Sequence, residues 1–121
     1  MAKRVLLVDD NTHVRQTLPF VLREHGYEVE LAKNGEEAFR IACQRHVDLV
    51  LTDISMPYVD GVELIRLMRR DHFLKSVPVI AMTAFGSQRR AEAKDAGATV
   101  CMEKPLHHGE LVSVIDRLTR G

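Results

Sequence analysis

The stretch RVLLVDDN, residues Arg4–Asn11, carries the strongest signal for the fold of this 121-residue chain. The apolar run Val5–Val8 is followed at once by two carboxylates, Asp9 and Asp10. An almost continuous apolar run of this length is typical of a parallel strand that is covered on both faces. Two like charges at the end of such a strand are costly unless another group offsets their repulsion. The stretch therefore predicts a buried strand whose carboxyl end meets a compensating positive charge.

Short apolar runs alternate along the chain with longer amphipathic segments. The runs are Val5–Val8, Val29–Leu31, Leu49–Leu51, Val79–Met82 and Val100–Met102. The second run belongs to the alternating segment Glu28–Ala32, which suits an edge strand. The helix-like segments are residues 12–26, 35–46, 61–71, 87–97 and 109–120. Five strand-then-helix units in succession predict an α/β fold in which helices cover both faces of a five-stranded parallel sheet.

Several residues mark where the predicted helices bend, begin or end. Pro19 lies inside the first helical segment, where it removes a hydrogen bond and is expected to kink the helix. Gly26 is expected to end that helix, Ser87 to cap the start of the fourth, and Gly97 to end the fourth. His107 and His108 are expected as surface residues at a helix start, and His13 at a solvated helix start, with contact to the rim of the sheet as its alternative. A solvated helix face, with a partner surface as the alternative, is expected for Arg89, Arg90 and Lys94.

Composition limits the classes of function that fit. Lys and Arg together number 17 and balance 17 Asp and Glu, so no basic excess points to direct nucleic-acid binding. No apolar run approaches the roughly 20 residues that span a membrane, and the N-terminus resembles no signal peptide, which favours the cytoplasm. Cys43 and Cys101 are far apart and are expected to be buried small side chains in a reducing compartment. We expect one domain over residues 1–121.

Chemically active side chains follow the predicted strands. In open α/β sheets, sites form beyond the carboxyl ends of the strands. There the chain places Asp9 and Asp10, then Asp53, Thr83 and Lys104. Clustered carboxylates favour a hard cation such as Mg²⁺, while a lysine and a hydroxyl suit a further oxyanion. The set predicts phosphoryl transfer to a carboxylate nucleophile.

Four motifs carry a resemblance to a known family. They are VDD (Val8–Asp10), DISMPYVDG (Asp53–Gly61), MTA (Met82–Ala84) and KP (Lys104–Pro105). In this order the whole chain resembles the receiver domain of two-component response regulators. The resemblance implies a flavodoxin-like doubly wound sheet with strand order 2-1-3-4-5, an order that a chemotaxis receiver of this family exemplifies.

The resemblance also implies roles for residues at the strand ends. Asp53 corresponds to the phosphoacceptor and, with Asp10 and the backbone carbonyl of Ser55, to a direct ligand of Mg²⁺. Asp9 corresponds to a residue that acts mainly through a metal-bound water.

Three further positions match the family pattern. Thr83 corresponds to the switch hydroxyl that moves toward the phosphoryl group. Lys104 corresponds to the lysine that pairs with a phosphoryl oxygen, and Lys104–Pro105 to a cis peptide. Gly61 corresponds to the glycine that lets the loop after Asp53 turn into the third helix.

One position departs from the family pattern. Many receivers carry Tyr, Phe or His three residues before the lysine, whereas this chain has Cys101. We expect output here not to use an aromatic flip but to pass through Phe85 and the start of the fourth helix at Ser87. Phe85 either substitutes partly for the missing aromatic residue or shields the acyl phosphate from water.

The implied function is a phosphoacceptor signalling switch. A histidine kinase or histidine phosphotransfer protein would donate the phosphoryl group, and a downstream protein target would respond to the modified surface. The chain would be a monomer or a weak phosphorylation-dependent dimer, without membrane insertion, and would catalyse only its own phosphorylation and dephosphorylation.

Two other classes of protein fit the sequence less well. An aspartyl-phosphate phosphatase or phosphotransferase commonly has a second acid two residues after the nucleophile, where this chain has Ser55. A flavin-binding module of similar fold would have a phosphate-cradling loop after the first strand, where DDNTH (9–13) is acidic and lacks glycine.

Overall fold

The computed structural model describes residues 2–120, in which five parallel strands form one sheet in the order β2-β1-β3-β4-β5. The strands are β1 (Arg4–Val8), β2 (Glu28–Ala32), β3 (Leu49–Asp53), β4 (Val79–Thr83) and β5 (Val100–Glu103). The helices are α1 (Thr12–Glu24), α2 (Gly35–Gln44), α3 (Gly61–Arg70), α4 (Arg90–Ala96) and α5 (His108–Thr119). Fold class, strand order and the edge position of β2 are as predicted.

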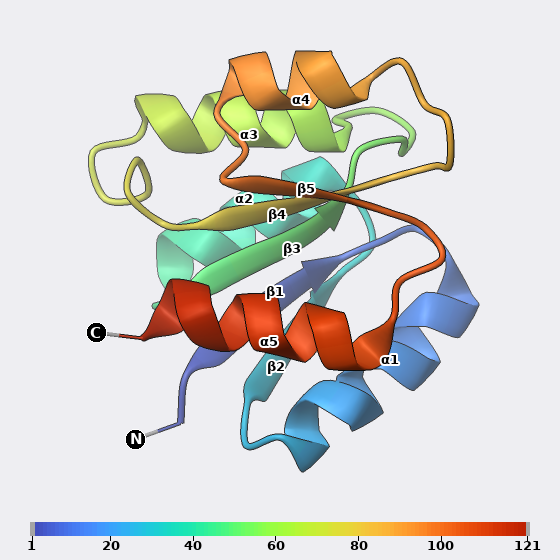
Figure 1. Cartoon of the computed structure of the whole chain (residues 1–121). Helices are drawn as coiled ribbons and strands as arrows, with labels where there is room; N and C mark the ends of the chain where they lie inside the picture. Colours follow the sequence, from blue (N-terminus) through green and yellow to red (C-terminus); the bar gives the residue numbers. More distant parts are fainter. Residues whose placement is uncertain (1, 121) are drawn as a thin grey trace.

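Helices cover both faces of the sheet, with α1 and α5 on one side and α2, α3 and α4 on the other (Figure 1). Alternate residues of β1 belong to two different cores. Val5 and Leu7 pack with residues of α1 and α5, whereas Leu6 and Val8 pack with residues of α2 and α3. All four are fully buried. Because both faces of β1 are covered, its sequence is continuously apolar instead of alternating.

The register of the strands brings their carboxyl ends to one edge. Val8 pairs with Thr52, Asp53 with Met82, and Thr83 with Glu103. The residues that follow β1, β3, β4 and β5 therefore share a common rim of the sheet, which is the precondition for a composite site there.

The predicted helix limits are partly confirmed. Helix α1 runs without interruption through the buried Pro19, and the N–H of Gly26 closes its end on the carbonyl of Arg23. Gly97 ends α4 in the left-handed region, with φ 118°. The prediction that Ser87 caps α4 is wrong, since that helix begins at Arg90. The Ser87 hydroxyl instead accepts the Arg89 N–H inside a preceding turn.

The two cysteines differ. Cys101 is buried, as predicted, but the prediction for Cys43 is wrong because its side chain is exposed. On α2 the buried stripe consists of Ala38 and Ala42, which are four residues apart and share one face. Cys43 lies one position further, so it points away from the core. Among residues 2–120, no helix is both long enough and apolar enough to cross a membrane.

Helix α3 begins directly against the end of β3. The Gly61 N–H donates to the Ile54 carbonyl at 3.1 Å. A Cβ at Gly61 would lie 2.7 Å from the Ile54 Cα and still closer to the carbonyl oxygen of Asp53. Gly61 is required here because two backbone segments approach each other with no room for a side chain. This close approach fixes the position at which the loop after Asp53 returns to the sheet and enters α3.

Replacing Gly61 with alanine is expected to lower the free energy of unfolding by about 1–3 kcal/mol, because backbone atoms must shift to admit the methyl group. Chemical denaturation measures the change. Gly109→Ala is the matched control, since no atom lies within 4 Å of a Cβ at that α5 position. The control should keep or raise stability, by up to about 1 kcal/mol. Equal losses in both variants would contradict the steric explanation.

Candidate functional site

Three carboxylates converge beyond the neighbouring strands β1 and β3. One oxygen from each of Asp9, Asp10 and Asp53 lies within 4.8 Å of the others. Asp9 is fully buried and Asp53 is 9% exposed, whereas Asp10 lies in solvent. The structure thus brings together the three acidic residues that the sequence placed at the strand ends.

Lys104 provides the positive charge that the adjacent carboxylates require. Its Nζ lies 3.3 Å from Oδ2 of Asp53 and 3.5 Å from Oδ2 of Asp9. The Lys104 N–H donates to the Thr83 carbonyl at 2.8 Å, which fixes the backbone at the end of β5. The peptide bond between Lys104 and Pro105 is cis, as predicted. Lys104 therefore bridges two of the three acids.

The Asp9 carboxyl group is fully buried at the centre of this charged rim. Burial raises the pKa of its carboxyl group, and the nearby charge of Asp53 adds to that effect. The Asn11 N–H, which donates to Oδ1 at 2.9 Å, and the Lys104 ammonium oppose the rise without cancelling it. The direction of the shift shows that the ionised form of Asp9 is under-compensated in this arrangement.

The two oxygens of Asp53 have different surroundings. Oδ1 accepts the backbone N–H of Ser55 at 3.3 Å, on the side of the loop toward α3. Oδ2 faces Lys104. The carboxylate is therefore held in one orientation at the end of β3, while the 9% exposure of Asp53 leaves a narrow approach from solvent.

Thr83 ends β4 at the same rim, but its hydroxyl is engaged elsewhere. The side chain is 1% exposed, and its Oγ1 donates to the Met102 carbonyl at 3.5 Å. This distance is at the long limit for an O–H···O hydrogen bond. Thr83 is thus poised near the carboxylate cluster while its hydroxyl bonds weakly to β5.

The donor set suits a divalent cation. Three carboxylates face one lysine ammonium, so two negative charges remain without a partner in the cluster. An all-oxygen set with two residual charges fits a hard ion such as Mg²⁺, which binds one or two carboxylates, keeps waters, and contacts phosphate oxygens. Asp9, Asp10 and Asp53 are the side chains that could hold such an ion.

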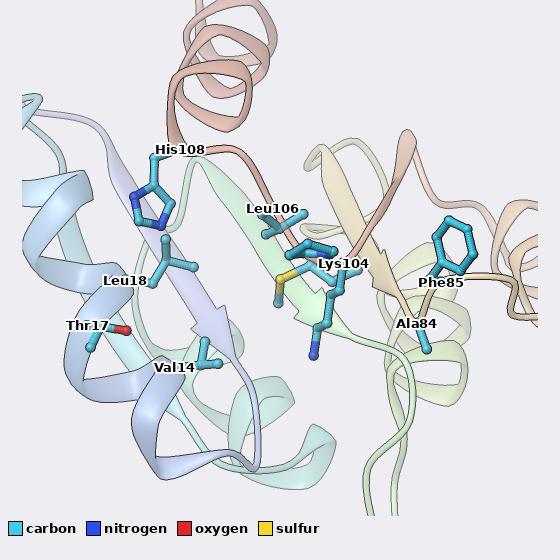
Figure 2. Close-up of a pocket in the computed structure, with 10 residues that line it drawn as sticks. Val14, Thr17, Leu18, Ala84, Phe85, Lys104, Leu106 and His108 are labelled. Atoms are coloured by element: carbon cyan, nitrogen blue, oxygen red, sulfur yellow. The ribbon is translucent and has the colours of Figure 1, made fainter.

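The histidines near the helix starts lie where the sequence predicts them, whereas the predicted shielding role of Phe85 finds no support in its position. His13, His107 and His108 are exposed at helix starts, as expected. Phe85 is 85% exposed, and in Figure 2 its ring extends away from the Lys104 ammonium. This conformation does not support a shielding role for the ring.

An apolar pocket of about 480 Å³ adjoins the carboxylate cluster. Figure 2 shows Val14 and Leu18 of α1 facing Lys104 and Leu106 across it. No sequence pattern predicts this pocket, because it forms only where α1 meets the connection between β5 and α5.

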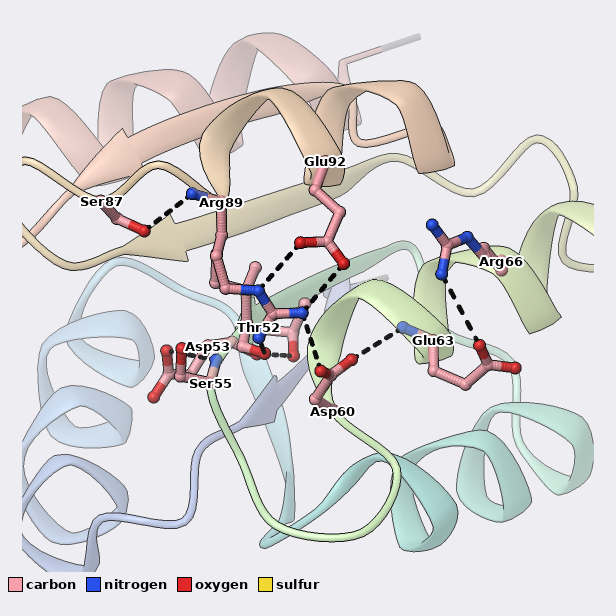
Figure 3. Close-up of polar contacts among 10 residues, drawn as sticks. Thr52, Asp53, Ser55, Asp60, Glu63, Arg66, Ser87, Arg89 and Glu92 are labelled. Carbon is pink, nitrogen blue, oxygen red and sulfur yellow. Dashed lines mark hydrogen bonds and ion pairs between the residues drawn. The ribbon is translucent and has the colours of Figure 1, made fainter.

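Arg89 does not lie on the solvated helix face that the sequence predicts. Its guanidinium donates to Asp60 at 2.9 Å and to the Ile54 carbonyl at 3.3 Å (Figure 3). Asp60 caps α3 by accepting the Glu63 N–H at 3.0 Å. The Asp-Gly pair before α3 signals the cap in the sequence, but no local pattern signals its partner, 29 residues away.

Comparisons with known proteins agree with this geometry. A family model described as the response regulator receiver domain matches residues 5–116. The probable transcriptional regulator ycf29 of Pyropia yezoensis is 34% identical over 119 residues, which are 98% of this chain and 54% of that protein. The regulatory protein PhoB of Pseudomonas aeruginosa is 31% identical over 121 residues, covering 99% of this chain and 53% of PhoB. The chain spans about half the length of these curated relatives.

Solved structures show the same relationship. A putative response regulator from Chloroflexus aurantiacus J-10-fl superposes with a TM-score of 0.95 at 31% identity, covering all of both chains. The receiver domain of the sensor histidine kinase PA1611 from Pseudomonas aeruginosa PAO1, solved with magnesium in its active-site cleft, gives 0.93 at 31% identity with the same full coverage. With its motifs at the rim of this sheet, the chain belongs to the receiver-domain family of two-component response regulators.

Proposed function

We propose that residues 1–121 form a single receiver domain that works as a phosphorylation-controlled switch with Asp53 as the phosphoacceptor. The observation that carries the proposal is the position of the Asp53 carboxylate, within ion-pair distance of Lys104 and beside Asp9 and Asp10. The chain would work in the cytoplasm, where a histidine kinase or histidine phosphotransfer protein would present the phosphohistidine. Membership of the receiver family supports this class of donor.

Asp10, Asp53 and the backbone carbonyl of Ser55 would hold Mg²⁺, and Asp9 would act through a water. Bound Mg²⁺ supplies charge neutralisation for the phosphoryl oxygens. The exposure of Asp10 supports a direct contact, because its side chain is open to solvent. Asp9 is fully buried, which supports a contact through a water.

The chemistry follows from the surroundings of Asp53. A carboxylate oxygen attacks phosphorus, an oxygen–phosphorus bond forms, and the nitrogen–phosphorus bond of the donor breaks, which returns a neutral imidazole after protonation. The Ser55 N–H orients the nucleophile by holding Oδ1, and the Lys104 ammonium offsets the negative charge that gathers around the transferred group. Hydrolysis of the acyl phosphate by water restores the carboxylate and releases inorganic phosphate.

The switch would depend on Thr83. Its hydroxyl gives up only a 3.5 Å hydrogen bond to Met102 if it turns to donate to a phosphoryl oxygen. A small gain at the phosphoryl group can therefore shift the balance between two arrangements of β4 and the segment that follows it. A changed surface on α4, β5 and α5 would then be presented to a downstream protein, with the chain a monomer or a weak dimer.

The two rival classes lack the groups they need. Ser55 lies two residues after Asp53 and is exposed, and a hydroxyl there cannot replace a carboxylic acid as general acid and base. The connection from β1 to α1 provides Asp9, Asp10 and Asn11 in place of a glycine-rich phosphate cradle. The chain would therefore catalyse only its own phosphorylation and dephosphorylation.

Asp53→Asn is expected to abolish modification by a small-molecule phosphodonor in the presence of Mg²⁺, because the amide is not a nucleophile. Intact mass spectrometry measures the added phosphoryl group. Asp95→Asn is the matched control, since Asp95 is an exposed aspartate on α4, and it should be modified as the wild type is. Undiminished modification of Asp53→Asn would refute the assignment.

Mg²⁺ is expected to stabilise the wild type, by about 2.7 kcal/mol at a hundredfold excess over its dissociation constant. Asp10→Asn should lose more of this gain than Asp9→Asn, because direct ligation contributes more than a contact through water. Asp10→Lys should be more stable than the wild type without metal and should not respond to Mg²⁺, since its ammonium replaces a repelling charge. Thermal unfolding with and without Mg²⁺ measures each effect. A larger loss in Asp9→Asn would reverse the two roles.

A further inference from the structure

The Arg89 side chain joins two segments that carry different parts of the proposed switch. Arg89 precedes α4 in the segment that follows β4 and Thr83. Its guanidinium reaches the connection between β3 and α3, where Nη1 donates to the Ile54 carbonyl at 3.3 Å and Nη2 lies 2.9 Å from Oδ2 of Asp60 (Figure 3).

These two contacts bracket the loop that follows Asp53. Ile54 comes directly after Asp53, and Asp60 is the last residue before α3. Between them lie residues 55–59, which include the proposed Ser55 metal ligand. The Ile54 carbonyl also accepts the Gly61 N–H at 3.1 Å. One guanidinium therefore holds both ends of the loop.

A second acid, Glu92, fixes the orientation of the Arg89 guanidinium. Its Nε and Nη2 donate to the two carboxylate oxygens of Glu92 at 3.0 and 3.2 Å, a two-pronged contact one turn along α4. Hydrogen bonds from Glu92 and then Asp60 raise the pKa of the guanidinium. The Arg89 side chain is 32% exposed, so a simple ion pair would contribute little. The planar Arg89 guanidinium, which contacts two carboxylates and a carbonyl, is far more directional than a simple ion pair.

Arg89 is also connected closely to Thr83. Residues 84–88 between them are folded into turns, in which the Ser87 N–H donates to the Ala84 carbonyl at 2.9 Å and the Arg89 N–H to the Ser87 hydroxyl at 3.1 Å. Within the described residues, no side chain caps the start of α4. The Arg89 guanidinium ties this helix end to the loop after Asp53, while Arg90 contacts Cys101 and Glu103 of β5.

We propose that Arg89 is a positioning residue that couples the loop after Asp53 to the segment 83–96. The inference rests on the proposed function, because it takes that loop as part of the metal and phosphoryl site. A ligand that holds the loop after Asp53 in one position then also holds the start of α4 through Arg89. Because coupling is reciprocal, a shift of α4 changes the affinity of the loop for that ligand.

Hydrogen exchange of the full chain tests the coupling. The probe is Mg²⁺ with beryllofluoride, a phosphoryl analogue, and the readout is the change in exchange at residues 53–60 and 84–96. In the wild type both segments should respond. In Arg89→Gln the response of 53–60 should persist, whereas that of 84–96 should fall by at least about twofold.

Two further variants separate coupling from general loosening. Arg90→Gln removes the same charge one residue away, where the guanidinium pairs with Glu103 of β5 at 3.7 Å, and it should respond as the wild type does. Asp60→Asn keeps an acceptor for the Glu63 N–H but loses the ion pair, so it should reproduce Arg89→Gln.

The possible outcomes are distinct. A full response of residues 84–96 in Arg89→Gln overturns the coupling while the proposed function stands. Equal loss in Arg90→Gln overturns it too, because the effect would then be a general weakening of α4. Absence of any response at residues 53–60 in the wild type refutes the proposed metal and phosphoryl site, and the coupling with it.

Discussion

Repulsion among carboxylates at one edge of the sheet is the constraint on which the rest of the structure depends. Parallel strands must end at a common rim, so acids that follow β1 and β3 are forced together. Lys104 offsets part of the repulsion, while burial, with a smaller effect of the Asp53 charge, still raises the pKa of the Asp9 carboxyl group. A cluster with more carboxylates than ammonium groups suits a hard divalent cation.

The position of the rim is set by backbone contacts more than by the acids themselves. Gly61 brings the start of α3 against the end of β3, and Gly35 similarly brings α2 against the Val59 carbonyl, to which its N–H donates at 2.9 Å. Side chains at these glycines would push both helices outward. The loop after Asp53 is therefore held at its far end by two close approaches, which keeps the carboxylate geometry precise although Ser55, Pro57 and Tyr58 of the loop are exposed.

The sequence was sufficient for features that depend on local patterns. Apolar runs predict all five strands, and the residues at or just beyond the strand ends include Asp9, Asp53 and Lys104, which lie together because the strands are parallel. Family resemblance added the strand order and the cis peptide before Pro105. Long-range side-chain contacts were missed. Nothing near Arg89 in the sequence indicates a partner 29 residues away, and the exposure of Cys43 depends on the exact rotation of α2.

The segment from Thr83 through α4 is the part of the rim best able to adopt a second arrangement. Helix α4 has seven residues, and an isolated helix of that length is not stable by itself, so its position depends on tertiary contacts. Those contacts are polar and partly exposed at its start, through Arg89, and a 3.5 Å hydrogen bond holds Thr83. With a thiol at Cys101, no aromatic ring on β5 can report the change by flipping. A signal from Asp53 would then leave the site through the backbone turns after Thr83 and the guanidinium of Arg89, which meet at the first turn of α4.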